Sequence, residues 1–360
     1  MNIPSVLFLQ PNRVRRSYVG GYNLELIEGR KNCSDSFYPE DWIASTVRAV
    51  NDNSSAKEKD AGISTIEING KEMLFDKIVD DCAELVFGPE HIEKYGRTMP
   101  FLQKLLDSSV RLHFQVHPDI PFARKYLNSD HGKTEAYLIL KVRDEIKNPY
   151  IYLGFQRPLG KNELKKAILD QDIEKLESCF DKIPVHCGDV FLVPGGLPHA
   201  IGEGIMLLEV MEPADFTFVP EFTRHGLTLS EHKRYMGLDI DKCLQAVDYK
   251  AYPLEKIKAK FMFKPQTTKD NRNFRIERLL PAAAIPFNLS RIKIFNEYES
   301  GRNRPQWLIN IVIKGEGEIY HDSGKNKLKP GDKFLIPYSS GEYLIKSSSE
   351  EMTIIQTTSV

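Results

Sequence analysis

Two segments of this chain share a pattern that is typical of a small β barrel. Residues 188–194 read Gly-Asp, then four residues that begin a strand, then Pro, and residues 331–337 repeat this order. A Gly-Asp pair favours a tight turn, and proline removes a backbone hydrogen-bond donor, so each segment describes a turn that leads into a short strand. The repeat therefore predicts two β units in one chain.

Helical and strand signals elsewhere come in blocks rather than in strict alternation, which argues against a parallel doubly wound sheet. Apolar residues at three- and four-residue spacing, such as Leu74, Ile78 and Cys82, indicate helix. Pro100 precedes a further apolar run and suits a helix start. We therefore expect a mainly β fold with helical insertions at about residues 71–107, 160–182 and 228–248.

Four polar residues lie where strands of the first unit would bring them together. Residues 112–117 alternate apolar and polar side chains, so Gln115 and His117 point to the same face of a predicted strand. Glu135 begins a later apolar run, and His199 follows the first Gly-Asp segment. Two imidazoles, a carboxylate and an amide oxygen suit a borderline divalent ion such as zinc. The sequence therefore predicts one metal site with these four ligands.

The second β unit lacks a comparable ligand set. Residues 338–343 stand where residues 195–200 stand in the first unit, and they contain no histidine. We therefore expect residues 1–255 to form the metal-binding domain, with the helical insertions, and residues 256–360 to form a β domain without metal ligands. One metal ion per chain follows from this division.

Composition and charge argue against several classes of function. The 360 residues are 41% hydrophobic, which suits two core-forming globular domains. Lysine and arginine number 49 against 50 aspartates and glutamates, so no net charge attracts nucleic acid or an anionic membrane. No apolar run approaches the roughly 20 residues that a membrane helix needs. We expect no nucleic-acid or membrane partner, and a monomer or homodimer.

The cysteines and the N-terminal segment bear on the cellular compartment. The five cysteines are scattered and contain no CxxC pair, which favours reduced thiols over a disulfide framework. Residues 1–10 lack the basic region of a signal peptide. We therefore expect a cytoplasmic protein.

Four motifs occur in an order and at spacings that resemble the type I mannose-6-phosphate isomerases, a zinc-dependent family of the cupin superfamily. The motifs are PFLQKLLD at 100–107, QVHP at 115–118, GKTEA at 132–136 and PGGLPHAI at 194–201. The resemblance extends over roughly residues 10–250. It implies two cupin barrels of jelly-roll type, a helical portion, and one zinc ion held by the four predicted ligands.

The resemblance also implies an activity. Family members interconvert mannose 6-phosphate and fructose 6-phosphate by moving a proton between C1 and C2 of the open-chain sugar. This chemistry needs a base that takes and returns the proton, together with stabilisation of the anionic intermediate. A hexose phosphate is therefore the expected substrate.

Five residues are candidates for catalysis and substrate binding. Lys133 lies two residues before a predicted ligand, and Glu209 follows His199 on the expected next strand, so both are candidate catalytic residues. Lys133 is also a candidate for substrate binding. The other candidate substrate-binding residues are Glu40, which matches a family acidic residue, together with His113 and Arg224.

The chain departs from the family pattern at Val219, where characterised members carry an arginine. Valine cannot replace the planar, multi-donor guanidinium that would bind phosphate or stabilise anionic charge. Three alternatives therefore stay open: a sugar-sensing or catalytically altered metal cupin, an isomerase of a different sugar, and an iron oxygenase, because two histidines and a carboxylate also bind iron.

Overall fold

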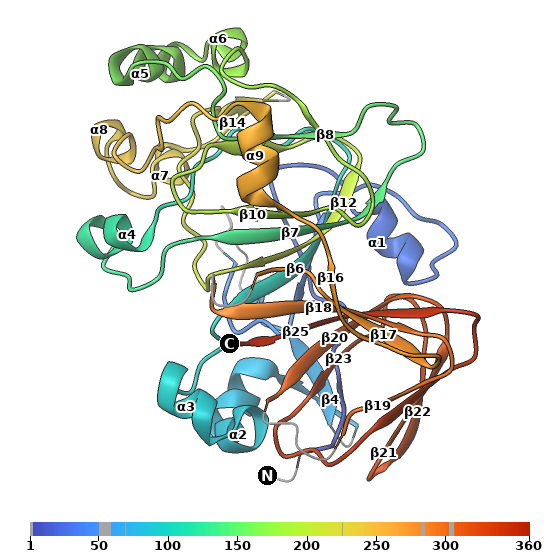
Figure 1. Ribbon diagram of the computed structural model, residues 1–360. Coiled ribbons are helices and arrows are strands. Elements are labelled where there is room, and N and C mark those ends of the chain that lie inside the picture. The colour runs from blue at the N-terminus through green and yellow to red at the C-terminus, as the bar shows by residue number, and fades with distance from the viewer. Residues whose placement is uncertain (1–2, 50–58, 69, 225, 282–284, 302–305) are drawn as a thin grey trace.

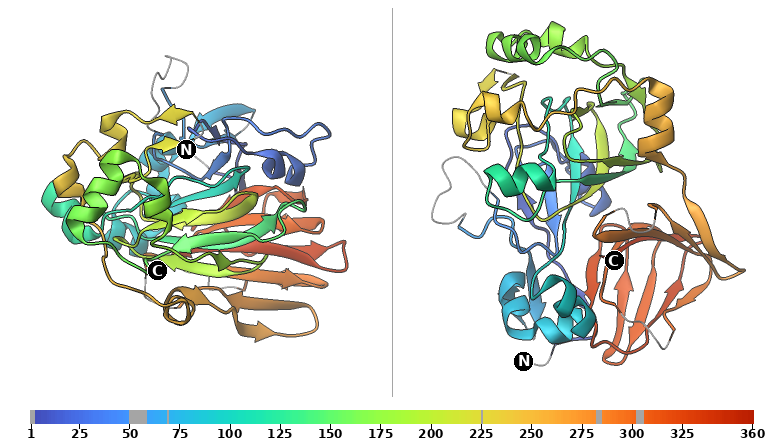
Figure 2. Two further views of the ribbon diagram at one scale, coloured as in Figure 1. Left: turned by 90° about the horizontal axis from the view of Figure 1, so that it is seen from above. Right: turned by 60° about the vertical axis from the view of Figure 1, so that its left-hand side comes forward.

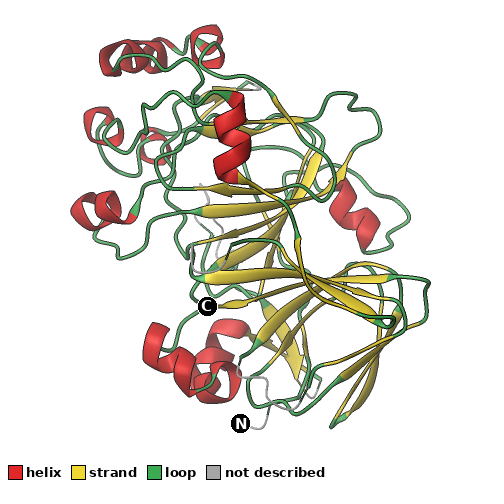
Figure 3. Cartoon of the chain, in the orientation of Figure 1, coloured by secondary structure: helices red, strands yellow, loops and turns green. Residues whose placement is uncertain are grey.

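The computed structural model describes residues 3–49, 59–68, 70–224, 226–281, 285–301 and 306–360. Its regular structure is mainly β strand, arranged as two barrels with helices at their periphery (Figures 1 and 3). The expected mainly β fold with two β units and helical insertions is confirmed.

The first barrel packs a seven-stranded sheet against a three-stranded sheet. The large sheet has the order β15-β10-β7-β12-β6-β3-β2, and the small sheet has the order β11-β8-β9. The strands of the large sheet are β2 (Arg13–Val14), β3 (Glu40–Ile43), β6 (Leu102–Ser108), β7 (Glu135–Val142), β10 (Val190–Val193), β12 (Ile205–Met211) and β15 (Met262–Phe263). The strands of the small sheet are β8 (Tyr150–Leu153), β9 (Ile183–Pro184) and β11 (His199–Ile201). One buried cluster, including Ile139, Leu153 and Leu207, fills the space between them.

The second barrel pairs a seven-stranded sheet of order β1-β23-β20-β25-β18-β17-β16 with a four-stranded sheet of order β19-β24-β21-β22. The strands of the large sheet are β1 (Leu7–Phe8), β16 (Gln266–Asp270), β17 (Phe274–Arg278), β18 (Phe287–Ile294), β20 (Leu308–Lys314), β23 (Lys333–Ile336) and β25 (Met352–Ser359). The strands of the smaller sheet are β19 (Glu297–Glu299), β21 (Gly317–His321), β22 (Gly324–Leu328) and β24 (Leu344–Ser347).

Helices and two short hairpins surround the barrels. The helices are α1 (Tyr22–Ile27), α2 (Phe75–Phe87), α3 (Pro89–Tyr95), α4 (Ile120–Tyr126), α5 (Lys161–Asp170), α6 (Ile173–Glu177), α7 (Glu231–Arg234), α8 (Ile240–Cys243) and α9 (Leu254–Phe261). The hairpins are β4 (Thr65–Ile68) with β5 (Lys71–Leu74), and β13 (Thr223–Arg224) with β14 (Leu227–Thr228). Within the described residues, no helix has the length and apolar character needed to span a bilayer.

The two large sheets share one hydrophobic core, so the barrels pack face to face. This core joins Leu105, Leu138 and Leu208 of the first barrel to Ile309 and Ile355 of the second. An ion pair also crosses the interface, because the ammonium of Lys333 on β23 contacts the carboxylate of Asp41 on β3. The relative position of the barrels is therefore fixed by both packing and charge.

The division of the chain differs from the predicted one at both ends. Strand β1, at the N-terminus, pairs with β23 and completes the second barrel. Helices α2 and α3 lie beside that barrel as well, and the backbone N–H of Tyr338 donates to the carbonyl of Val86 (Figure 2). At the other end, β15 pairs with β10 of the first barrel, beyond the predicted boundary at residue 255.

The predicted helical block at 71–107 is wrong at both of its edges. Residues 102–108 form strand β6, which is buried along its whole length, and residues 71–74 form β5. A short apolar run fits a fully buried strand as well as a helix, and here the sheet provides buried faces on both sides. The strand expected near residues 112–117 is present only as isolated bridges at Gln115 and Val116.

Candidate metal centre

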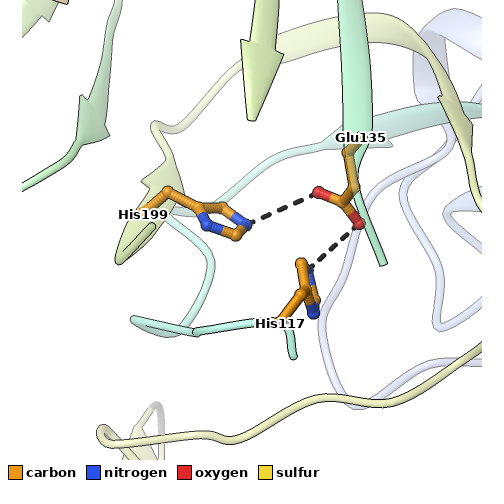
Figure 4. A group of neighbouring side chains, drawn as sticks. All are labelled: His117, Glu135 and His199. Atoms are coloured by element: carbon orange, nitrogen blue, oxygen red, sulfur yellow. Dashed lines mark ion pairs between the residues drawn. The ribbon is translucent and has the colours of Figure 1, made fainter. Parts of the chain in front are cut away.

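Three of the predicted ligands converge in the interior of the first barrel. Glu135 begins β7, His199 begins β11, and His117 follows the bridged residues before α4 (Figure 4). Nε2 of His117 lies 3.1 Å from Oε1 of Glu135, and Nε2 of His199 lies 3.5 Å from Oε2 of the same carboxylate. The ligand atoms of all three residues lie within 4.8 Å of one another, and all three residues are buried. This geometry can hold one metal ion.

Two glycines allow the segments that carry these residues to approach closely. A Cβ at Gly132 would lie 2.8 Å from the backbone nitrogen of Ile120, and one at Gly195 would lie 2.7 Å from the carbonyl oxygen of Pro118. Backbone bonds from Lys133 to Pro118, 2.9 Å, and from Gly196 to His117, 2.7 Å, hold the segments together. The glycines in the two motifs therefore serve the assembly of the site.

Both imidazoles are oriented by backbone carbonyls. Nδ1 of His117 lies 2.9 Å from the carbonyl oxygen of Phe216, and Nδ1 of His199 lies 2.8 Å from that of Leu197. When Nδ1 carries the proton, Nε2 presents its lone pair to the centre, as metal-binding histidines do. Burial lowers the pKa of His117 to about 4, against the attraction of Glu135, so this imidazole is neutral near pH 7.

An orphaned atom indicates that the residues fit a metal ion. Among the described residues, Nε2 of His117 is buried without a hydrogen-bond partner, although it faces Glu135. Such an atom costs free energy unless something accepts its lone pair. A cation between the three side chains would satisfy it and would match the ligand types of zinc.

The fourth predicted ligand, Gln115, lies beside this group. Its backbone pairs with that of His199 through two bonds of 3.0 Å, and its side-chain Nε2 lies 3.1 Å from Nε2 of His199. Amide orientations are assigned from hydrogen bonding, and a half-turn of this amide would direct the oxygen to the centre. The role of Gln115 as a ligand stays a prediction, with the amide at a suitable position.

A row of polar side chains crosses the large sheet next to the centre. The strand register aligns Trp42, Lys104, Glu209 and Tyr137 on β3, β6, β12 and β7, in that order. Because side chains alternate along a strand, aligned residues share one face of the sheet. The hydroxyl of Tyr137 donates to the carboxylate of Glu135, which connects the row to the metal centre.

Charges of both signs alternate around this row. Nζ of Lys104 lies 3.0 Å from Oε1 of Glu209 and 3.6 Å from Oε1 of Glu40. Next to the predicted ligands, Nζ of Lys133 lies 3.3 Å from Oε1 of Glu135. The predicted residues Glu40, Lys133 and Glu209 are therefore all buried within one charged network, as part of the same interior.

The two glutamates beside Lys104 have opposite pKa shifts. Burial raises the pKa of Glu209 to about 8, with a further contribution from the charge of Glu135. Burial would also raise the pKa of Glu40, but Arg16 and Lys104 hold it well below the usual range. Before metal binds, Glu209 therefore takes up a proton more readily than an exposed glutamate does, while Glu40 is ionised near pH 7.

Metal loading at pH 7 should release a proton from Glu209. A nearby dication favours the carboxylate form and lowers the pKa, whereas His117 is already neutral and contributes no proton. Calorimetric zinc titrations in buffers of different ionisation enthalpy measure this release. We expect Glu209→Gln to release about one proton fewer per bound ion than the unchanged protein. Equal release from both proteins would contradict the assigned protonation state.

Two predicted substrate-binding residues lie in a separate cluster. Nδ1 of His113 lies 2.6 Å from the carbonyl oxygen of Glu221, and the guanidinium of Arg224 lies 2.6 Å from the Glu221 carboxylate. Arg111 forms a second ion pair with Glu221 at 2.7 Å. These contacts connect His113 and Arg224 to Glu221, and their contact with substrate stays a prediction.

Sequence reasoning missed several members of the network. Lys104 lies in the run predicted to be helical. If residues 102–108 had been predicted as a buried strand, Lys104 would have been recognised as the one cation in that strand. Arg16, Tyr18 and Asp215 carry no local signal, because only the folded chain brings them to Glu40 and Lys133.

A large hollow elsewhere in the molecule contains no comparable chemistry. It has a volume of about 860 Å³ and lies on the second barrel, where Glu316, Glu318 and Asp332 alternate with Lys327 and Lys346. Neither sign of charge dominates its lining, and the metal-ligating cluster of the described residues lies in the first barrel. The candidate site is therefore the metal centre.

The chain is similar to known mannose-6-phosphate isomerases. Residues 284–357 match the family model described as the cupin domain of mannose-6-phosphate isomerase. A Bacillus subtilis protein named as a probable mannose-6-phosphate isomerase is 27% identical over 286 residues, covering 77% of this chain and 80% of the relative. The mannose-6-phosphate isomerase of Streptococcus mutans is 28% identical over 253 residues, covering 69% of this chain and 72% of the relative.

A solved structure shares the fold over almost the whole chain. The crystal structure of mannose 6-phosphate isomerase from Bacillus subtilis matches with a TM-score of 0.73 and 23% identity, covering 98% of this chain and 99% of the other. The two-barrel arrangement is therefore common to both proteins.

Proposed function

Since this chain belongs to the type I mannose-6-phosphate isomerase family, we propose that it interconverts mannose 6-phosphate and fructose 6-phosphate. The observation that carries the proposal is the buried His117, Glu135 and His199 group, with Lys133 beside Glu135 and Glu209 buried in the same charged network. The proposal includes one zinc ion per chain, with Gln115 as its fourth protein ligand, and a cytoplasmic location.

The residues beside the centre have the properties that an aldose–ketose isomerisation needs. A zinc ion held by His117, Glu135 and His199 would supply positive charge that stabilises the anionic intermediate. Lys133 contacts Glu135, Glu209 contacts Lys104 in the same buried network, and both Lys133 and Glu209 have a group that can hold a proton. One of them carries the proton between C1 and C2, and the other stabilises charge on the neighbouring oxygen. The buried surroundings exclude water and strengthen these interactions.

The experiment that tests the function follows fructose 6-phosphate formation by the zinc-loaded protein. We expect Lys133→Met to lower kcat by roughly 100-fold or more, because the loss of a group that transfers a proton or stabilises charge in the transition state has this magnitude. The exposed Lys147 is a matched control, and Lys147→Met should leave kcat unchanged. Zinc content, measured on every variant, separates loss of chemistry from loss of metal.

A metal-binding cupin without turnover is the alternative that Val219 favours. Val219 is buried, and its backbone N–H donates to the carbonyl of Arg234, so this position supplies no cation. A zinc-loaded protein that binds hexose phosphates but forms no product would support the alternative. Turnover of another aldose phosphate would support isomerase activity on a different substrate. Oxygen consumption that depends on ferrous iron would indicate an oxygenase.

A further inference from the structure

Arg16 brings a guanidinium to the charged network from a segment outside the four motifs. It follows β2 at the edge of the large sheet, and its Nε donates to Oε2 of Glu40 at 2.8 Å. Its guanidinium carbon lies 5.0 Å from the centre of the Trp42 ring. Trp42 is itself fully buried and donates to the same Glu40 carboxylate. The ring and the carboxylate together fix the plane of the guanidinium.

Arg16 lies where the charged network reaches solvent. The Arg16 side chain is 14% exposed, whereas those of Lys104 and Lys133 are 6% and 4% exposed. Asp215, which forms an ion pair with Arg16, is 19% exposed. Of the three cations around the centre, Arg16 is therefore the one that an incoming ligand meets first.

The guanidinium keeps donors available for a ligand. It has five N–H donors, and within the described part of the chain only Nε makes a hydrogen bond. Its Nη1 faces Oδ2 of Asp215 at 3.6 Å, which is an ion pair but too long for a hydrogen bond. An anion with several acceptor oxygens can therefore occupy the Nη edge without breaking the bond to Glu40.

The order of contacts places Arg16 at a distance from the metal centre. Glu135 contacts Lys133 at 3.3 Å, Lys133 contacts Asp215 at 3.9 Å, and Asp215 contacts Arg16 at 3.6 Å. Two residues thus separate Arg16 from the carboxylate ligand. A hexose 6-phosphate has its reacting carbons and its phosphate at opposite ends, so a cation in this position suits the phosphate rather than the C1 and C2 oxygens.

We propose that Arg16 binds the phosphate group of a phosphorylated sugar, and so provides from the N-terminal segment the guanidinium that Val219 does not. This inference rests on the proposed function for the placement of the sugar, but it concerns binding and can be measured without turnover. Arg16 acts as a substrate-binding residue, and Trp42 and Glu40 act as the residues that position it.

The test measures equilibrium binding of fructose 6-phosphate, fructose and inorganic phosphate to the zinc-loaded protein. We expect Arg16→Gln to weaken binding of fructose 6-phosphate and of inorganic phosphate by about tenfold or more, and to leave fructose binding unchanged. Arg16→Lys keeps the charge beside Glu40 but loses the planar guanidinium. Its affinity for the two phosphate ligands should therefore lie between that of the unchanged protein and that of Arg16→Gln. The adjacent Arg15 is exposed, and Arg15→Gln is the matched control that should bind all three ligands normally. Zinc content and melting temperature are compared for every variant.

The outcomes separate this inference from the proposed function. Arg16-dependent binding of both phosphate ligands supports the role of Arg16, even if mannose 6-phosphate is never converted, in which case only the isomerase proposal fails. Unchanged phosphate binding in a folded, zinc-loaded Arg16→Gln protein would overturn the inference while leaving turnover possible. Equal weakening for fructose and fructose 6-phosphate would also overturn it, because that pattern indicates a general disturbance of the site. If the unchanged protein binds neither phosphate ligand, the inference is wrong.

Discussion

Replacement of His199 by alanine is expected to abolish both stoichiometric zinc binding and isomerase activity. The substitution removes one of three buried ligands whose donor atoms lie within 4.8 Å of one another. Loss of an outer partner of a metal ligand already costs roughly 10- to 100-fold in metal affinity, and loss of the ligand itself should cost more. Metal analysis of the purified variant, followed by an assay of the same preparation, measures both effects.

A matched control for His199→Ala is available on the surface. The side chain of His186 is 81% exposed and lies outside the metal cluster, so His186→Ala should keep full zinc content and activity. Activity that persists in a metal-free His199→Ala protein would be incompatible with the proposed mechanism. Normal zinc content in that variant would instead show that the ion binds elsewhere.

Of the proposed substitutions, Lys333→Met is expected to lower the free energy of unfolding the most. It removes the ammonium that contacts the carboxylate of Asp41 between the barrels, where the two side chains are only 4% and 2% exposed, and leaves Arg13, at the longer distance of 3.8 Å, as the remaining cation. Removal of one member of a buried ion pair typically costs about 3–5 kcal/mol. Urea unfolding monitored by circular dichroism gives the change in the free energy of unfolding.

Two further variants distinguish the ion pair from a general packing effect. Lys327→Met changes an exposed lysine of the same barrel and should alter the free energy of unfolding by less than about 0.5 kcal/mol. Adding Asp41→Asn to Lys333→Met removes the carboxylate that has lost its ammonium while keeping an acceptor for the N–H of Asn12, so the double variant should recover part of the lost stability. A double variant as unstable as the sum of the single ones would rule out direct coupling.

The metal cluster was predictable because its residues carry unusual chemistry in a short pattern. His117 and His199 are imidazoles next to proline and glycine turns, and such side chains seldom gather in one interior without a ligand. Their convergence did not depend on the predicted strand, which is present only as isolated bridges. Local turns and close glycine contacts bring these side chains together, whereas the alternation of side chains along a strand was expected to do so.

The charged network beyond the metal was less predictable, for a physical reason. Lys104 is recognisable only once residues 102–108 are known to be a strand. The sequence does not decide this, because a short apolar run can be buried equally well in a strand or in a helix. Arg16 reaches the network through the pairing of β2 with β3, which is a long-range contact. No spacing rule within a segment predicts which distant cation will lie beside Glu40.

The pairing of β1 with β23 has a consequence for how the chain folds as it is synthesised. Leu7 is made before the strands of the first barrel, whereas its partner Leu335 is made after them. Strand β1 therefore has no strand partner until β23 has been synthesised. Contacts so distant in sequence also form slowly, because a long loop must close first. We infer that the second barrel closes last and that, until it does, an apolar strand edge at the N-terminus depends on other protection from aggregation.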